Sequence, residues 1–223
     1  MSSLPVGSQK CACPKSRHKP RFVVLTGGPG GGKTAILEIA KLCFCGHVVL
    51  LPEAAGIVFG GGFPRLDTPV GRRASQRTIY QVQNEMLRLV EHNPEVAMVL
   101  CDRGTVDGLA YWPGSTRSYF DQVGSTMTKE LARYAAVIHI ATPSSPAQYH
   151  RNSIRRESLA EARAIDARIR KAWSEHPRQM VIEADSDFFS KAAEAIEAIR
   201  AEVPACCRIS AHTEGLNKLA QRA

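Results

Sequence analysis

The sequence lacks any long hydrophobic run. No stretch approaches the roughly 18 apolar residues that a membrane-spanning helix requires. The first 21 residues carry basic side chains but no apolar core of the kind found in a secretory signal. Both absences argue against a membrane-spanning or secreted protein, and we expect the chain to be cytoplasmic.

Cysteine spacing typical of a zinc ribbon is also missing. The seven cysteines form two CxC pairs, one CC pair and one singlet, and no CxxC is present. Their odd number in a chain expected inside the cell favours reduced thiols over disulfides. Metal binding by Cys11 and Cys13 would need partners that the sequence does not identify, so we interpret both as incidental thiols of a flexible arm. The cysteines are Cys11, Cys13, Cys43, Cys45, Cys101, Cys206 and Cys207.

Positive charge is in excess, with a formal net charge of +8. This balance would suit a nucleic-acid-binding protein, but the basic residues are scattered through the predicted helices, and the densest run, residues 10–21, precedes the first predicted strand. Small phosphate-bearing ligands attract the same charge. We therefore do not expect a nucleic-acid partner, and binding to nucleic acid or to an acidic membrane surface is the minority interpretation.

Length and composition predict one domain. A chain of 223 residues with 44% hydrophobic content can form one well-packed α/β domain but not two large ones. We expect residues 1–20, rich in Ser, Pro, Lys and Cys, to be a disordered basic arm. Residues 21–203 would form the folded domain, and residues 204–223 a basic C-terminal tail.

Short apolar runs alternate with helical patterns inside this domain. The runs are continuous, as in strands buried on both faces of a parallel sheet. Helical spacing of apolar residues covers 73–92 and 157–176. The alternation predicts a three-layer α/β/α sandwich. The runs cover residues 22–25, 47–51, 96–101, 136–140 and 179–182.

A phosphate-binding motif follows the first predicted strand. The segment fits GxxxxGKT and leads into an apolar helical stretch, so strand, loop and helix stand in the required order. Glycines let backbone N–H groups converge on a phosphate beside the positive end of the helix. The predicted nucleotide-binding residues are Gly27, Gly28, Pro29, Gly30, Gly31, Gly32, Lys33, Thr34 and Ala35.

Two side chains of this motif have specific predicted roles. Lys33 would bridge the β- and γ-phosphates, and the Thr34 hydroxyl would bind Mg²⁺. The alternative, a glycine-rich turn with a chance GKT, does not explain the matching flanking elements. The motif therefore predicts binding of ATP or GTP with magnesium.

The third predicted strand runs into Asp102 and Arg103. Asp102 is where a carboxylate that holds Mg²⁺ usually lies in a P-loop protein. A mechanical ATPase would carry a glutamate next to it, so Arg103 favours phosphoryl transfer to a bound acceptor over hydrolysis. An acid that only caps the next turn is the alternative for Asp102.

Glu53 ends the second predicted strand, and ligands gather at the carboxyl ends of parallel strands. Its carboxylate could accept the proton of an attacking hydroxyl or orient the acceptor. A loop acid that bonds neighbouring N–H groups is an equally open interpretation. Asp107 is a candidate substrate contact or a helix cap.

A predicted lid follows the fourth strand. Three arginines there, Arg151, Arg155 and Arg156, precede a long helix. Arginines that close over phosphates stabilise the transferring phosphoryl group and exclude water. A solvated helix face is the alternative.

Several segments taken together resemble one family. They are TGGPGGGKT, PEAA, CDRGTVDGLAYWPG, Arg155-Arg156-Glu157 and AWSEHPRQMVIEADSDFFSK. Over roughly residues 21–200 the chain resembles the AAA-type domain family that includes the ribosylnicotinamide kinase domain of NadR and the TRPL-translocation-defect proteins. The resemblance implies a nucleoside-kinase-like P-loop fold with strand order 2-3-1-4-5, ATP or GTP as ligand, and catalytic or substrate roles for Glu53, Asp102 and Arg103. It does not indicate the substrate.

Candidate acceptor contacts lie on the helix after a glycine-rich loop. Arg73, Arg77, Tyr80 and Gln83 occupy the position where nucleoside kinases read their substrate, although Tyr80 and Gln83 could simply face water. By the same resemblance the loop 185–191 would lie near the nucleotide base, with a helix cap at Asp187 as the alternative.

Two functions follow from these patterns. The first is a kinase that passes the γ-phosphoryl of ATP or GTP to a small hydroxyl-bearing acceptor such as a nucleoside. The second is a nucleotide-dependent switch or scaffold. No NKxD guanine-reading motif is present, which argues against an ordinary Ras-like GTPase.

Overall fold

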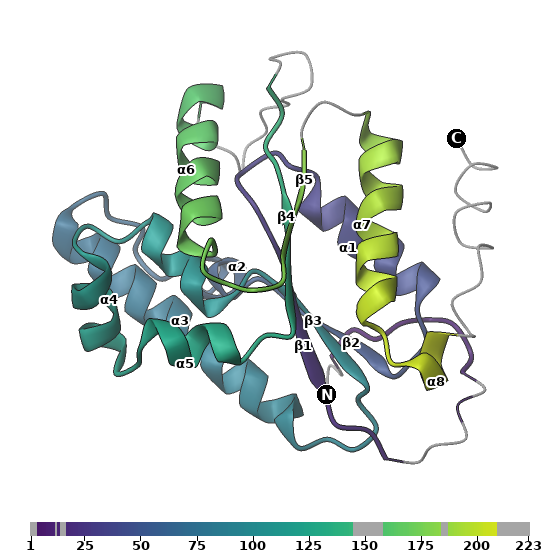
Figure 1. Ribbon diagram of the computed structural model, residues 1–223. Helices are drawn as coiled ribbons and strands as arrows, with labels where there is room; N and C mark the ends of the chain where they lie inside the picture. Colours follow the sequence, from purple (N-terminus) through teal and green to yellow (C-terminus); the bar gives the residue numbers. More distant parts are fainter. Residues whose placement is uncertain (1–3, 12, 14–16, 145–157, 184–186, 209–223) are drawn as a thin grey trace.

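The computed structural model describes residues 4–11, 13, 17–144, 158–183 and 187–208. In this part of the chain a single five-stranded parallel sheet has the strand order β2-β3-β1-β4-β5, which confirms the predicted fold. Helices flank the sheet on both sides (Figure 1). The strands are β1 (Arg21–Thr26), β2 (Val48–Leu51), β3 (Met98–Asp102), β4 (Ala136–Ile140) and β5 (Gln179–Ile182).

The strands coincide with the predicted apolar runs because both faces of the sheet are covered. Every residue of β2 and β4 is buried. The central strand β1 pairs with β3 and β4, and the register places Leu25 opposite Asp102. The last residue of β3 therefore lies beside the end of β1, where the phosphate motif begins.

Two helices cover each face of the sheet. Helices α1 (Lys33–Cys43) and α7 (Phe188–Glu202) pack on one face, and α3 (Pro69–Glu91) and α6 (Leu159–Ala172) on the other (Figure 1). Alternate residues of β1 serve the two cores, since Val23 and Leu25 face α1 and α7 whereas Val24 faces α3 and α6.

Capping residues determine where the two long helices begin. Helix α3 begins at Pro69, ahead of the predicted residue 73, because the Thr68 side chain accepts a hydrogen bond from the Gly71 N–H and Pro69 fits the first turn. A capping box of Ser158 and Glu161 starts α6.

Shorter helices connect these elements. Tyr80, Trp112, Tyr119, Phe120 and Val123 form a small core of their own between α3 and α4. The short helices are α2 (Ala54–Gly60), the 3₁₀ helix η1 (Thr105–Ala110), α4 (Thr116–Val123), α5 (Met127–Ala132) and α8 (Ala205–Arg208).

Composition predicts a disordered arm, whereas residues 4–11 of this arm lie against the edge of the sheet. Val6 forms an antiparallel bridge with Val49, and the Leu50 N–H donates to the Pro5 carbonyl at 2.8 Å. The arm covers the outer edge of β2, whose backbone groups would otherwise lack partners. Composition alone misses this pairing because the backbone supplies the contacts.

The start of the predicted C-terminal tail is also packed. Helix α8 follows Pro204, and Cys207 on it is buried in the core beneath α1 and α7. Residues 209–223 lie outside the described residues.

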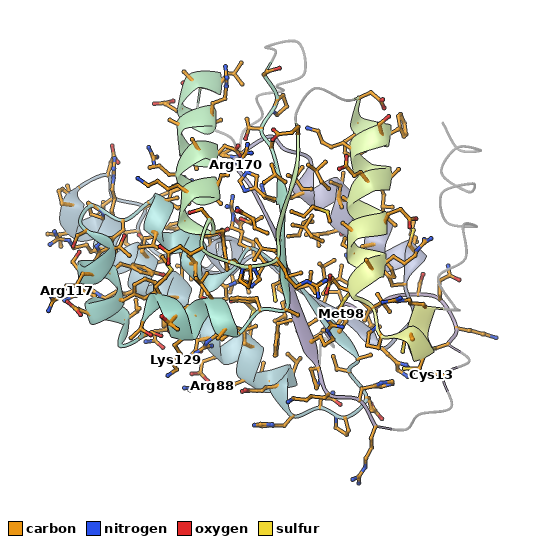
Figure 2. The ribbon with its side chains drawn as sticks, in the orientation of Figure 1. Cys13, Arg88, Met98, Arg117, Lys129 and Arg170 are labelled. Carbon is orange, nitrogen blue, oxygen red and sulfur yellow. The ribbon has the colours of Figure 1, made fainter. Side chains whose placement is uncertain are left out.

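Charged side chains are distributed over many elements. Arg88, Arg117, Lys129 and Arg170 are exposed on four different helices, whereas Met98 is buried in the sheet (Figure 2). Among the described residues, no helix combines the length and the apolar character needed to span a membrane.

Candidate active site at the carboxyl ends of the strands

The phosphate loop requires glycine at two positions in particular. Gly27 has φ 132°, and a Cβ atom there would lie 2.0 Å from the Ile140 carbonyl oxygen. Gly32 has φ 90° and precedes the first turn of α1. Any other residue would be strained at these positions, so the glycines allow the loop to pass close to β4 and turn into the helix.

Lys33 folds back over the loop. Its Nζ donates to the Gly27 carbonyl at 2.8 Å and to the Gly28 carbonyl at 2.7 Å, and the side chain is buried. Burial lowers the pKa of Lys33 to about 8, and the nearby Arg103 guanidinium lowers it further, against the opposing effect of Asp102 and Glu53. Thr34 and Ala35 are exposed at the start of α1.

Residues distant in sequence support the loop from behind. Asp166 on α6 accepts from the Gly28 N–H at 2.6 Å and contacts the buried His139 Nε2 at 3.1 Å. The Thr142 hydroxyl donates to the Pro29 carbonyl at 3.1 Å. Sequence reasoning missed these three side chains. His139 and Thr142 could have been identified from the sequence, because both lie near the carboxyl end of β4, where ligands gather in a parallel sheet.

Asp102 lies at the end of β3 and is partly buried. Within the described part of the chain its carboxylate makes no hydrogen bond and no ion pair, and it does not cap η1, which starts after Gly104 without a side-chain cap. Burial raises the pKa of Asp102 to about 6 and the Glu53 carboxylate adds to the rise, while Lys33 and Arg103 oppose it.

Arg103 has a left-handed backbone, with φ 71°. Its N–H donates to the Leu25 carbonyl at 3.0 Å, and its own carbonyl accepts from Gln83 Nε2 at 2.6 Å. The guanidinium extends toward the loop, where Nη1 lies 3.3 Å from the Gly27 carbonyl oxygen. A non-glycine residue in this conformation is uncommon and is found most often at functional positions.

Glu53 is paired with this arginine. Arg103 Nε donates to the Glu53 carboxylate at 2.5 Å. Burial by itself would raise the pKa of Glu53, but the charges of Arg103 and Lys33 outweigh it and lower the pKa. Glu53 precedes α2 without a side-chain capping bond. Its side chain is 38% exposed, so the carboxylate can reach a ligand.

Asp107 occupies a buried position behind the site. Its two carboxylate oxygens accept from the Thr26 hydroxyl and the Trp173 indole, each at 2.5 Å, and one of them lies 3.4 Å from Arg103 Nη1. These partners use both oxygens inside the protein. The 3.4 Å contact places Asp107 against the Arg103 guanidinium, and η1 begins without a side-chain cap. A substrate contact by Asp107 stays a prediction.

The candidate acceptor residues lie in different surroundings. Arg73 is exposed, donates to the Pro113 carbonyl at 3.2 Å and lies over the Trp112 ring. Arg77 pairs with Gln122 at 3.1 Å. Gln83 is buried and holds the Arg103 carbonyl, so the expectation that it could face water is wrong.

The remaining sequence-predicted residues are the three lid arginines and Asp187. Arg151, Arg155 and Arg156, assigned to a lid, lie outside the described residues. Asp187 caps α7 by accepting from the Phe189 and Ser190 N–H groups. The next residue, Phe188, lies so close to the loop that a Cβ on Gly32 would come within 3.0 Å of its ring.

The parallel sheet, the glycine loop before α1 and the charged cluster at the strand ends define a P-loop domain with a three-layer α/β/α fold. The AAA domain family model matches residues 22–191, and the chain belongs to this family. A search of curated proteins finds no sequence match.

Solved structures with this fold include NadR and a nucleoside kinase. NadR in complex with NR aligns with a TM-score of 0.63 at 16% identity, covering 84% of this chain and 53% of NadR. NadR in complex with NAD and AMP-PNP aligns with a TM-score of 0.55 at 14% identity, and the alignment covers 82% of this chain and 49% of NadR. Deoxyadenosine kinase from M. mycoides, with the products dCMP and dCDP, aligns with a TM-score of 0.53 at 11% identity. This alignment covers 81% of this chain and 99% of the kinase. The chain spans about half the length of NadR, and at these identities the likeness shows the fold.

Proposed function

We propose that this protein is a kinase that transfers the γ-phosphoryl group of ATP or GTP to a hydroxyl group of a small, nucleoside-type acceptor. The observation that carries the proposal is the Glu53–Arg103 pair, with Arg103 also directed at the Gly27 carbonyl of the phosphate loop. A carboxylate and a guanidinium joined beside a P-loop suit transfer to a bound hydroxyl, because one can accept its proton and the other can stabilise phosphoryl charge.

The phosphate loop would bind the triphosphate. Its N–H groups lie at the start of α1, where the helix dipole favours anions. On triphosphate binding, Lys33 Nζ would donate its hydrogen bonds to phosphate oxygens in place of the Gly27 and Gly28 carbonyls. The phosphate oxygens are stronger acceptors because they are charged. Phe188, which lies against Gly32 and is 40% exposed, is placed to contact the nucleotide.

The residues present suit a magnesium ion. Thr34 offers an exposed hydroxyl and Asp102 a carboxylate without a hydrogen-bond partner among the described residues, and Mg²⁺ prefers such hard oxygen ligands. Thr34 and Asp102 would hold the ion, directly or through water, and the bound ion would neutralise phosphate charge.

Glu53 would position the acceptor. Its lowered pKa keeps the carboxylate ionised at neutral pH, so it can accept a hydrogen bond from the attacking hydroxyl and take its proton as the new O–P bond forms and the bond to the leaving diphosphate breaks. Arg103 holds this carboxylate in place and faces the charge that develops on the phosphoryl group.

A product assay tests the proposal. The full chain is incubated with ATP or GTP, Mg²⁺ and a panel of nucleosides that includes ribosylnicotinamide and deoxynucleosides, and phosphorylated products are detected by mass spectrometry. We expect a product with at least one acceptor, and its loss in Lys33→Ala. Lys41→Ala, which changes a partly exposed lysine of α1, serves as the matched control.

A nucleotide-dependent switch would give the opposite result in the product assay. If the wild-type protein binds ATP or GTP but phosphorylates no acceptor in the panel, and a partner protein binds only its triphosphate-bound form, the chain is a nucleotide-dependent switch and the kinase proposal fails. If Lys33→Ala leaves the affinity for both nucleotides unchanged, the assignment of the loop fails as well. We expect a loss of at least about tenfold, because charge-assisted bonds contribute roughly 1.5–3 kcal/mol each.

A further inference from the structure

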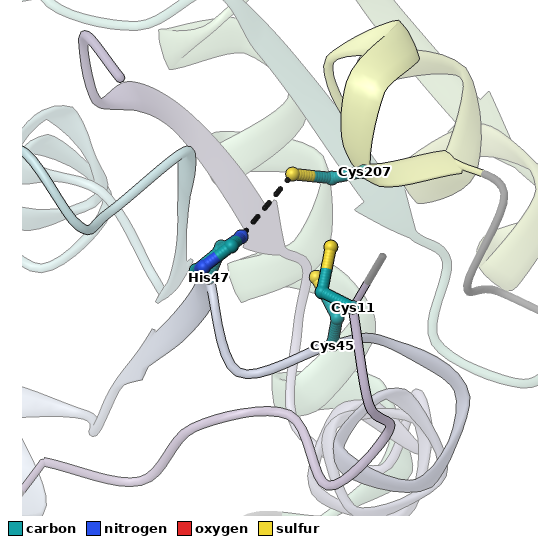
Figure 3. Close-up of side chains that lie close together, drawn as sticks. All are labelled: Cys11, Cys45, His47 and Cys207. Atoms are coloured by element: carbon teal, nitrogen blue, oxygen red, sulfur yellow. Dashed lines mark hydrogen bonds between the residues drawn. The ribbon is translucent and has the colours of Figure 1, made fainter. Parts of the chain in front are cut away.

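A cluster of sulfur and imidazole groups lies far from the phosphate loop. Cys11, Cys45, His47 and Cys207 each direct one ligand atom toward a common point, and these four atoms all lie within 4.8 Å of one another (Figure 3). The Cys207 Sγ and the His47 Nδ1 are 3.5 Å apart. Three separate segments supply the four side chains: the N-terminal arm, the connection between α1 and β2, and helix α8.

We propose that Cys11, Cys45, His47 and Cys207 form a structural zinc site that fastens the N-terminal arm and helix α8 to the start of β2. Three thiolates and one imidazole are a ligand set that Zn²⁺ takes in closed structural sites. Zinc bonds of about 2.3 Å to sulfur and 2.0 Å to nitrogen in a tetrahedron place the ligand atoms roughly 3.5–3.8 Å apart. The separations here need to shrink by no more than about 1.3 Å to reach that geometry.

The arm is held in position by contacts that do not involve the metal. The Gly7 N–H donates to the Val48 carbonyl at 2.9 Å, and the Gln9 N–H donates to the Phe44 carbonyl at 3.0 Å. A Cβ atom at Gly7 would lie 2.3 Å from the Phe44 carbonyl oxygen, so glycine allows the arm to lie directly on this connection. Cys11 is thereby brought to Cys45. The proposal therefore gives Cys11 a role in place of the interpretation of the arm thiols as incidental.

Hydrophobic packing alone does not explain why these cysteine side chains lie so close together. Cys45 and Cys207 are each 1% exposed, and buried cysteines often act only as small apolar side chains. Here, however, an imidazole nitrogen lies among them. Sulfur and nitrogen donors gathered within 4.8 Å of one another suit a metal ion better than packing alone.

A second set of donors surrounds the first. Cys13, His18, His47 and Cys207 also lie within 4.8 Å of one another. The His18 ring nitrogens, however, contact Cys13 at 3.7 Å and Cys206 at 3.9 Å. We assign the ion to the set with Cys45, because this buried residue and His47 lie on either side of Gly46 and offer two fixed ligands.

The site is separate from the proposed kinase chemistry. His47 immediately precedes β2, whereas the phosphate loop follows β1, and the strands are parallel, so the two sites lie at opposite ends of the sheet. All four ligands come from the protein, which leaves no open position for a substrate. The expected role is to fix the chain termini, and nucleotide binding does not depend on it.

Metal analysis of the full chain tests the proposal. The protein is expressed with zinc, purified without chelators or an affinity tag, and analysed by inductively coupled plasma mass spectrometry. We expect about one zinc per chain, and X-ray absorption showing three sulfur ligands at about 2.3 Å and one nitrogen at about 2.0 Å. Cys11→Ser, Cys45→Ser and Cys207→Ser should each lose most of the zinc, whereas Cys13→Ser and the core variant Cys43→Ala should keep it.

Control measurements distinguish loss of zinc from a failure of the variant to fold. Cys11 is half-buried on the arm, so Cys11→Ser should fold, which circular dichroism checks. Wild-type protein treated with a chelator should lose zinc and unfold several degrees lower, and Co²⁺ added to it should give a thiolate charge-transfer band. Absence of zinc from the wild type with no such band overturns the proposal. Loss of zinc in Cys13→Ser and His18→Ala but not in Cys11→Ser or Cys45→Ser also overturns it, because the other set then holds the ion.

Discussion

Arg103 Nε donates to the Glu53 carboxylate at 2.5 Å, across 50 residues of sequence. Glu53 follows β2 and Arg103 follows β3, two neighbouring strands of the parallel sheet. The pair therefore lies at the edge where the phosphate loop also begins.

Glu53→Gln should lower kcat by at least about 100-fold, because the amide cannot accept the proton of the acceptor hydroxyl. The affinity for ATP should change little, since Glu53 is not part of the phosphate loop. Steady-state kinetics with the acceptor found in the panel, together with calorimetric nucleotide titration, checks both quantities. Glu38→Gln, on the exposed surface of α1, is the matched control. A kcat within threefold of the wild type would remove Glu53 from the chemistry.

Arg103→Gly should be more stable than Arg103→Ala by about 1 kcal/mol, because only glycine adopts a positive φ without steric cost. Both variants lose the guanidinium, so their difference isolates the backbone conformation. Urea denaturation of the two variants measures it. Equal stability, or a more stable alanine variant, would show that φ 71° is not the conformation in solution. Both variants should lack kinase activity.

Asp102→Asn should abolish activity but stabilise the ligand-free protein at pH 7. The folded state raises the pKa of Asp102 to about 6, above the ordinary value, so the ionised carboxylate disfavours folding above that pH. This penalty disappears as the pH falls below the ordinary pKa of an aspartate. Allowing for solvent screening, we expect a gain of about 1 kcal/mol, or a Tm rise of roughly 2–4 °C.

The pH dependence of this effect is the control. The stability difference between Asp102→Asn and the wild type should shrink as the pH is lowered from 7 to 4, measured by thermal unfolding without Mg²⁺. A variant that is less stable than the wild type at pH 7 would contradict the raised pKa.

Nucleotide binding should be accompanied by proton uptake above pH 8. Burial and Arg103 lower the pKa of Lys33 to about 8 in the ligand-free protein, and triphosphate oxygens would raise it again. Affinity should therefore fall as the pH rises from 7 to 9. Calorimetry in two buffers with different ionisation enthalpies measures the uptake. Lys33→Arg, which stays charged over this range, should show no linked proton, and an equal uptake in that variant would assign it to another group.

The strands and the phosphate loop could be predicted from the amino-acid sequence. Continuous apolar runs predicted the strands, and two of the runs, 136–140 and 179–182, match β4 and β5 residue for residue, although only β4 is buried along its whole length. The glycines before Lys33 marked the loop because close approach to β4 excludes side chains there. Glu53, Asp102 and Arg103 could be named because the carboxyl ends of parallel strands meet at one edge.

The pairing of side chains, in contrast, depends on the folded arrangement of distant segments. Asp166 supports Gly28 from 138 residues away, and Asp107 bonds to Trp173 from 66 residues away. Neither contact has a local pattern. The same holds at the other end of the sheet, where Cys11 reaches Cys45 because the arm lies along β2 through backbone hydrogen bonds. Such bonds are available to any residue type, so the sequence pattern carried no sign of where the arm would lie.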